Sequence, residues 1–363
     1  MSRVLVVLGH AENRRLLADW LSAHYEVRLA EHPEAFDEPF DLGIVDWLGL
    51  ERYGPRIEAA KRSVQPIYLP FLLVTHRQGL GPGSARQAWE RVDELIYTPV
   101  EKIELGARVE MLLRARELSL LNAALRQKLE LELARAGEVQ AALLPRCAPA
   151  LRGIDLAARC IPAREVSGDF FDWQSNDEAV TMTVGDVMGK GMPAALLAAT
   201  VRAALRTVAR HHDPGAALDL VRESLSGDLE HTSSFATLFH ARVACANPGA
   251  SVRYVDAGHG HAFVRTREGD ILRLARGGRP VGFPAAAPYR ESTLTLREGD
   301  VLFVHSDGLV ETAETTAVTA PAELVAGLDM ACPAARIVEE VLDRALRRPP
   351  FDDATILVVK CAA

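Results

Sequence analysis

The chain has 363 residues, of which 48% are hydrophobic and 25% charged, and its formal net charge is −8 at pH 7. This length predicts two or three domains, and the composition is that of a globular protein with a sizeable core. The acidic balance argues against nucleic acid and anionic lipid as partners.

The apolar runs are too short to cross a bilayer, and the N-terminal run has the pattern of a buried strand. We therefore expect no membrane segment and no signal peptide. The cysteines are scattered, odd in number and without a CxxC pair, which predicts a reducing, cytoplasmic location. They are Cys147, Cys160, Cys245, Cys332 and Cys361.

Residues 1–115 alternate short apolar strands with helical segments. Strands are predicted at 3–8, 25–30, 42–46, 71–75 and 94–97. The segments between them, such as 11–24, have the apolar spacing of an amphipathic helix. This alternation predicts an α/β domain built on a doubly wound parallel sheet.

The next segment is helical over a long stretch. Between Val109 and Leu144 there is no Pro and a single Gly. Apolar residues recur there about every 3.6 positions, which predicts one long amphipathic helix. It has room for roughly three to four heptads, so it could form a coiled coil in a homodimer or pack on its own domain. The recurring residues are Leu118, Leu121, Leu125, Leu129, Leu133, Ala136, Val139 and Leu143.

The remaining chain has a different pattern, in which strand-like runs are joined by turns rich in Gly, Asp and Pro. Two helices are predicted at 192–212 and 333–348. Runs of strands with a few helices predict an α+β domain of packed antiparallel sheets. The expected organisation is a domain at 1–115, a helical linker at 116–147 and a second domain at 148–363.

Aspartates recur in this last domain where an apolar strand gives way to a turn. One such aspartate ordinarily caps nearby backbone amides, but several in one pocket would repel each other unless cations lay between them. Oxygen ligands select magnesium or manganese, and a two-metal site activates water for attack on a phosphoryl group. The aspartates are Asp169, Asp172, Asp186, Asp307, Asp352 and Asp353.

A glycine-rich turn beside one of these aspartates superficially resembles a nucleotide-binding loop. That loop requires four residues between its first Gly and the Gly-Lys pair, followed by Ser or Thr. Here three residues separate Gly185 from Gly189-Lys190, and Gly191 follows. The spacing argues against nucleotide binding. It leaves Lys190 as a solvated turn residue or a phosphate-binding residue.

Six motifs occur in order along the second domain, and together they resemble the PPM (protein phosphatase type 2C) superfamily, in its SpoIIE/RsbU-like branch. They are "PAREVSGDFFDW", "VGDVMGKGMPAAL", "FATLFHARV", "VDAGHGHAFV", "GDVLFVHSDGLVET" and "FDDATILVV". The resemblance covers about 138–363. It implies an αββα sandwich that hydrolyses phosphoserine or phosphothreonine on a protein.

The same resemblance implies roles for individual residues. Asp186 would bridge two manganese or magnesium ions, with the Val187 carbonyl as a further ligand. The ligand set would be completed by Asp169, Asp307 and Asp352. Asp172 and Asp353 would support the ligands, and Arg164 would either bind the phosphate or be an ordinary surface arginine. The implied substrate is a phosphorylated STAS-type anti-sigma-factor antagonist.

Residues 1–115 resemble a response-regulator receiver that has lost part of its site. Asp46 occupies the phosphoacceptor position and Thr75 ends the fourth strand, as in that family. Gly9-His10 replaces the acidic pair that would hold magnesium, and Thr98 stands in place of the lysine. Because phosphoryl transfer needs that metal, we expect a pseudo-receiver that binds a regulatory protein or dimerises. The alternative is a response regulator that is phosphorylated at Asp46.

The predicted function is therefore a metal-dependent protein phosphatase controlled through its N-terminal domain and helix. A contrasting hypothesis is a non-catalytic adaptor whose phosphatase-like domain only binds signalling partners. The complete set of carboxylates favours the enzyme.

Overall fold

The computed structural model describes residues 1–76, 88–176, 178–246, 248–283, 287–310, 321–346 and 351–361. The chain divides into two compact units, residues 1–130 and 131–363. None of the helices in these ranges is both long enough and apolar enough to cross a membrane.

The N-terminal unit is built on a five-stranded parallel sheet with the strand order β2-β1-β3-β4-β5. This order is one of the two common orders of doubly wound sheets. All five strands begin and end within one residue of the predicted bounds, which confirms the predicted sheet. They are β1 Arg3–Val7, β2 Glu26–Leu29, β3 Leu42–Asp46, β4 Phe71–His76 and β5 Glu94–Thr98.

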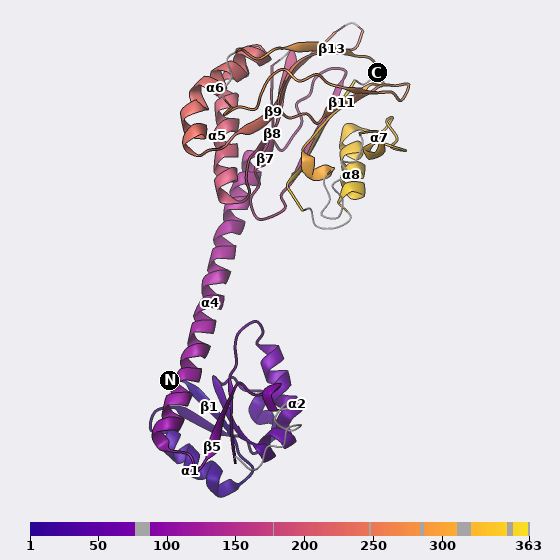
Figure 1. Cartoon of the computed structure of the whole chain (residues 1–363). Coiled ribbons are helices and arrows are strands. Elements are labelled where there is room, and N and C mark those ends of the chain that lie inside the picture. The colour runs from indigo at the N-terminus through magenta and orange to yellow at the C-terminus, as the bar shows by residue number, and fades with distance from the viewer. Residues whose placement is uncertain are drawn as a thin grey trace. The chain divides into compact units, whose positions relative to one another are not determined.

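Helices cover both faces of this sheet, as Figure 1 shows. On one face, α1 (Ala11–Leu21) and the first turns of α4 pack against the apolar side chains of β1 and β3. On the other face, α2 (Trp47–Ser63) and the short helix η1 (Pro33–Phe36) pack against β3 and β4. Because both faces are covered, the strands are apolar throughout and show no alternation.

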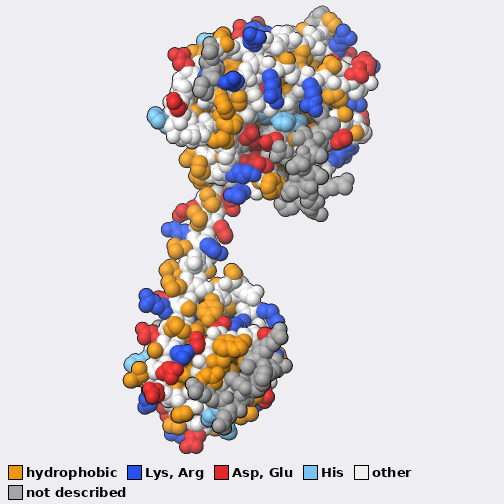
Figure 2. All heavy atoms as spheres, in the orientation of Figure 1, with side chains coloured by type: hydrophobic (Ala, Val, Ile, Leu, Met, Phe, Trp, Pro, Cys, Tyr) orange, Lys and Arg blue, Asp and Glu red, His pale blue; other side chains and the backbone are white. Residues whose placement is uncertain are grey.

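Helix α4 (Lys102–Leu143) runs without interruption for 42 residues. It begins before the predicted start at Val109, because its first turns belong to the core of the N-terminal unit. Beyond them, the predicted apolar stripe lies largely on the surface: the exposed fractions are 58% for Leu118 and 57% for both Leu125 and Leu129. Figure 2 shows hydrophobic side chains along this part of the chain.

The C-terminal unit contains two five-stranded sheets whose neighbouring strands are antiparallel. One has the order β13-β10-β9-β8-β7 and the other the order β12-β11-β14-β15-β6. The strands are β6 Ile154–Ile161, β7 Asp169–Ser175, β8 Ala179–Val187, β9 Ala236–Cys245, β10 Ala250–Ala257, β11 Ala262–Arg265, β12 Ile271–Arg273, β13 Ser292–Leu296, β14 Val301–His305 and β15 Ala354–Cys361.

The main core of this unit lies between the two sheets. Alternate residues of each strand enter it: in β15, Leu357 and Val359 face the other sheet, while Ile356 and Val358 face helix α8. Figure 1 shows α5 and α6 outside the first sheet and α8 outside the second. This arrangement confirms the predicted αββα sandwich. The helices are α5 Met192–Val208, α6 Pro214–His231, α7 Pro321–Leu324 and α8 Ala334–Ala345, with η2 at Asp307–Leu309.

Strands β6 and β7 and helix α6 were not predicted from the sequence. Pro214 begins α6, where its fixed φ angle and missing N–H cost nothing. Strand β7 carries Asp169 and Asp172 among aromatic residues, so its polar positions hid its strand pattern. The predicted helix at 333–348 is present to Ala345, and its last two residues lie outside the described ranges.

Candidate metal centre

Two of the predicted ligands are directly opposite each other on neighbouring strands. Asp169 begins β7, Asp186 lies near the end of β8, and the antiparallel register pairs them. Asp169 is only 3% exposed, and its Oδ2 atom is buried with no hydrogen-bond partner. Like charges in this arrangement are destabilising unless a proton or a cation separates them.

The pKa values of both carboxyl groups are raised, in part by this repulsion. Burial is the larger cause and the neighbouring charge of Asp186 the second, and together they raise the pKa of Asp169 well above its usual range. Burial, followed by the charges of Asp307, Asp352 and Asp353, raises the pKa of Asp186 to about 7. The charges of three further aspartates therefore act on this pair of carboxyl groups.

Asp307 and Asp352 reach this place from the second sheet. Asp307 follows β14 in the short helix η2, and Asp352 lies just before β15. The two turns touch at Gly308: a Cβ atom at this position would be 2.1 Å from the carbonyl oxygen of Asp353. Glycine is thus required for the approach that brings Asp307 toward Asp352.

The turn that follows β8 supplies a cation to this group. The Nζ atom of Lys190 lies 2.6 Å from Oδ2 of Asp352, and it also lies 4.9 Å from the centre of the Phe351 ring. In this structure Lys190 is therefore paired with a carboxylate of the centre and is not simply solvated.

Asp353 organises the loop that leads into β7. Its two carboxylate oxygens accept hydrogen bonds from the backbone amides of Ala163, at 2.8 Å, and Gly168, at 2.7 Å. These bonds place the loop beside the carboxylates. Arg164 lies on this loop with an exposed side chain that makes no ion pair with any described carboxylate.

Asp172 is placed away from the other aspartates, contrary to the supporting role expected of it. Side chains alternate across a strand, and Asp172 lies on the face of β7 that meets α5. There it accepts hydrogen bonds from Arg206, at 2.7 and 3.0 Å, and forms an ion pair with Arg202 at 3.4 Å. Its role in the structure is to hold α5 on the sheet.

The chemistry of the remaining aspartates fits a divalent cation. They offer oxygen ligands only, they repel one another, and Asp169 Oδ2 is a buried acceptor without a donor. No group of three or more His, Cys, Asp or Glu side chains in the described ranges has a ready-made ligand arrangement. The Val187 carbonyl lies close to this group, because a Cβ atom on Gly168 would be 2.9 Å from it.

Three histidines lie beside the carboxylates, and no role in the site was predicted for them from the sequence. The rings of His259 and His261 are 5.9 Å apart, and those of His261 and His305 are 5.2 Å apart. Burial lowers the pKa of His259 to about 3 and that of His305 to about 4, so both rings are neutral. Figure 2 shows histidine side chains next to an acidic patch on this unit. The "GHGH" sequence at a strand end was the signal that could have revealed them.

Comparison with known proteins identifies this unit. The profile of the SpoIIE family, stage II sporulation protein E, matches residues 176–362, which is more than half of the chain. The chain belongs to the SpoIIE family. Its SpoIIE domain has the fold of a PP2C-type phosphatase, as the two-sheet sandwich requires.

Individual relatives agree with this assignment. The chain is 25% identical to phosphoserine phosphatase RsbU of Bacillus subtilis over 245 residues, covering 65% of this chain and 72% of RsbU. Protein IcfG of Synechocystis is 27% identical over 214 residues, which span 51% of this chain but only 33% of IcfG.

Solved structures share the fold of the SpoIIE domain. The RsbU and RsbW domains of Rv1364c from Mycobacterium tuberculosis superpose with a TM-score of 0.53 at 27% identity, covering 59% of this chain and 62% of that chain. The SiaA-PP2C domain of Pseudomonas aeruginosa gives a TM-score of 0.56 at 20% identity, covering 66% and 98%.

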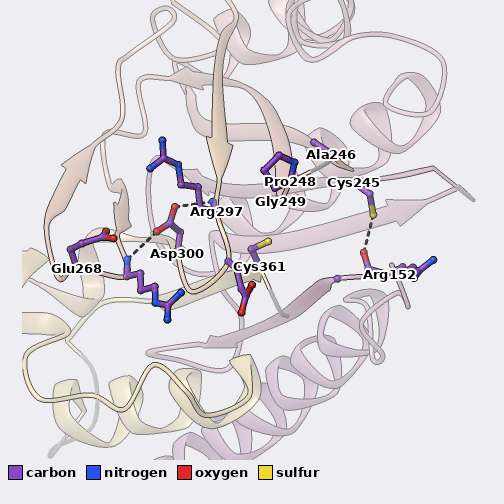
Figure 3. Close-up of a pocket in the computed structure, with 12 residues that line it drawn as sticks. Arg152, Cys245, Ala246, Pro248, Gly249, Glu268, Arg297, Asp300 and Cys361 are labelled. Carbon is purple, nitrogen blue, oxygen red and sulfur yellow. Dashed lines mark hydrogen bonds between the residues drawn. The ribbon is translucent and has the colours of Figure 1, made fainter.

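A cavity in the SpoIIE domain lies at the end of the strands away from these carboxylates. This cavity of about 960 Å³ is lined by the turns after β9, β11 and β13 and by the end of β15. Figure 3 shows Arg152 and Arg297 at its rim and Asp300 within it, where the Asp300 carboxylate accepts the backbone amides of Arg267 and Arg297. It contains none of the predicted ligands.

In the receiver-like site of the N-terminal unit, both carboxylate oxygens of Asp46, the phosphoacceptor position, accept hydrogen bonds from the backbone. Asp46 Oδ2 accepts the amide of Gly9 at 2.8 Å, and Oδ1 accepts the amide of Gly49 at 2.7 Å. A Cβ atom on Gly9 would be 2.7 Å from Cβ of Leu48, so an acidic side chain does not fit there. Thr75 is buried, and the hydroxyl of Thr98 pairs with the ring of His76.

This arrangement predicts that Asp46 does not accept a phosphoryl group. Treated with acetyl phosphate and magnesium, the protein should keep its unmodified intact mass, because both carboxylate oxygens are engaged and no acidic pair holds the metal. If the intact mass of the wild type instead rises by one phosphoryl group and that of Asp46→Asn does not, the receiver is functional.

Proposed function

We propose that the protein is a metal-dependent protein serine/threonine phosphatase. The observation that carries the proposal is the convergence of Asp169, Asp186, Asp307 and Asp352 within a SpoIIE domain, where their mutual repulsion calls for cations. RsbU, a relative, is named as a phosphoserine phosphatase.

Asp169, Asp186, Asp307, Asp352 and the Val187 carbonyl would hold two manganese or magnesium ions. When bound, such ions supply a water of lowered pKa and neutralise charge on the phosphoryl group. Asp353 fixes the loop that presents Arg164, whose guanidinium can donate two hydrogen bonds to the phosphate. Lys190 stands at the same place and adds a positive charge.

The substrate that we propose is a phosphorylated STAS-type anti-sigma-factor antagonist, as the SpoIIE/RsbU resemblance implies. The direct test uses this phosphoprotein and a phosphoserine peptide, with and without manganese. Manganese-dependent phosphate release from both supports the proposal, whereas binding of the phosphoprotein without release would favour the non-catalytic adaptor.

We further propose that helix α4 regulates this site. Within the SpoIIE domain, Gln140 of α4 donates to the carbonyl of Ser167 at 2.7 Å and accepts from its amide at 2.9 Å. Ser167 lies two residues before Asp169. Arg202 of α5 donates to the carbonyl of Leu143 and also pairs with Asp172. A shift of α4 would therefore act on both ends of the β7 segment that carries Asp169.

The exposed leucines of α4 support a homodimer through this helix, and replacing Leu125 and Leu129 by Asp tests it. Two charges in an apolar seam are costly to bury, so we expect dimer affinity to fall at least about a hundredfold. Light scattering measures the mass, and phosphatase assays measure the accompanying change in activity.

The matched control places the same two charges off the leucine stripe, as Gln127→Asp with Ala134→Asp. These two positions are also exposed. Loss of the dimer in both double variants, or in neither, would contradict a leucine seam.

A further inference from the structure

Three arginines beside the carboxylates form no ion pair with any residue that the structure describes. Arg273, Arg276 and Arg279 are exposed, and none forms an ion pair with a carboxylate of the described residues. Arg253 of the same domain, by contrast, pairs with both Asp213 and Glu291. The three unpaired arginines therefore leave a local excess of positive charge, here called the arginine strip.

The arginine strip follows one continuous segment of the chain. Arg273 ends the edge strand β12 and is paired with Phe263 of β11. The segment then crosses to the other sheet, where the amide of Gly277 donates to the carbonyl of Asp256 at 2.9 Å and Gly278 bridges to Ala257. The strip is thus fixed to both sheets by backbone contacts.

This segment lies against the loop that carries His259 and His261. A Cβ atom on Gly260 would be 2.5 Å from Nη2 of Arg276, and one on Gly258 would be 2.5 Å from Pro280. The loop is itself held by Asp256, whose carboxylate accepts the amide of Gly260 at 2.9 Å. Arg276 is therefore packed directly on the histidine loop.

The histidine loop in turn borders the carboxylates. The amide of His305 donates to the carbonyl of His261 at 3.0 Å, and Asp307 is two residues further along. On the other side, His259 Nδ1 lies 3.2 Å from Oγ1 of Thr237, which is the strand partner of Asp186. Figure 2 shows basic side chains, histidines and an acidic patch next to one another on this face.

We propose that the arginine strip docks acidic residues that flank the phosphorylated side chain of a protein substrate. The proposal rests on the phosphatase function proposed above and adds a preference among substrates. The acidic chain would repel a negatively charged segment in general, and the unpaired strip offers it complementary charge next to the carboxylates. Guanidinium groups suit this role, because they can bind carboxylates through two parallel hydrogen bonds.

The test compares two phosphoserine peptides of equal length, one with Asp and Glu around the phosphoserine and one with Asn and Gln. Binding is measured by fluorescence anisotropy at low and high ionic strength, for the wild type and for Arg273→Glu with Arg276→Glu. We expect the wild type to bind the acidic peptide about fivefold or more tightly. The double variant should lose this preference, and salt should weaken it.

The matched control is Arg152→Glu with Arg297→Glu, which makes the same change in net charge at the cavity in Figure 3. It should keep the preference. Equal preference in all three proteins, or equal loss in both double variants, would overturn the proposal.

Hydrolysis of para-nitrophenyl phosphate is followed in parallel. Unchanged turnover by Arg273→Glu with Arg276→Glu shows that this variant has an intact fold. If the wild type does not hydrolyse para-nitrophenyl phosphate, this result counts against the phosphatase function alone, because peptide binding is measured independently.

Discussion

Asp186→Asn should abolish metal-dependent phosphatase activity while leaving the protein folded. Asp186 is the member of the centre on which the charges of Asp307, Asp352 and Asp353 converge. Asparagine keeps its size but removes one negative charge, so the site should bind divalent cations more weakly. We expect kcat/KM for a phosphoserine peptide to fall at least about a hundredfold.

The matched control is Asp300→Asn, which changes a buried aspartate at the opposite end of the strands. This substitution should lower stability, because the Asp300 carboxylate accepts hydrogen bonds from two backbone amides. The variant should keep manganese-dependent turnover. Equal activity of Asp186→Asn and the wild type would exclude the proposed centre. No turnover in the wild type under any metal would leave the adaptor hypothesis as the better one.

Without metal, the free energy of unfolding of the wild type should fall as the pH rises from about 4 to about 7. That of Asp186→Asn should fall less over the same range. Burial and the neighbouring carboxylates raise the pKa of Asp186 from 3.8 to about 7. Between these values the folded state holds a proton that the unfolded state has released. The stabilising contribution of the protonated form is complete below about pH 4 and is lost as the pH passes 7.

Denaturant unfolding of both proteins without metal at about pH 5 and about pH 8 measures this effect. Between these two pH values, the free energy of unfolding of the wild type should fall relative to that of the variant by up to about 3 kcal/mol. Added manganese should then stabilise the wild type more than the variant. A difference that does not change with pH would show that Asp186 does not experience the repulsion.

The sequence was sufficient to predict the strands whose apolar pattern is uninterrupted and the aspartates at their ends. Asp169, Asp186, Asp307 and Asp352 are far apart along the chain, yet turn chemistry and the family resemblance grouped them. Asp172 could not be placed in the same way, because one step of strand register decides whether it meets the other carboxylates or α5.

Contacts that depend on tertiary packing were beyond the sequence. The pairing of Lys190 with Asp352 joins two turns that no periodicity relates. Gln140 is an unremarkable polar residue in the helical pattern until the loop around Ser167 lies against it. The arginine strip is visible only because the structure shows which arginines lack a carboxylate partner.

The packing at Gly9 bears on how the N-terminal unit can evolve. A mutation that restored an acidic residue at this position would bring its Cβ atom within 2.7 Å of Leu48, so Leu48 would have to change as well. Neither change alone completes the acidic pair, because His10 occupies its second position. A substitution that restores the acidic residue at Gly9 is therefore coupled to a second substitution at Leu48.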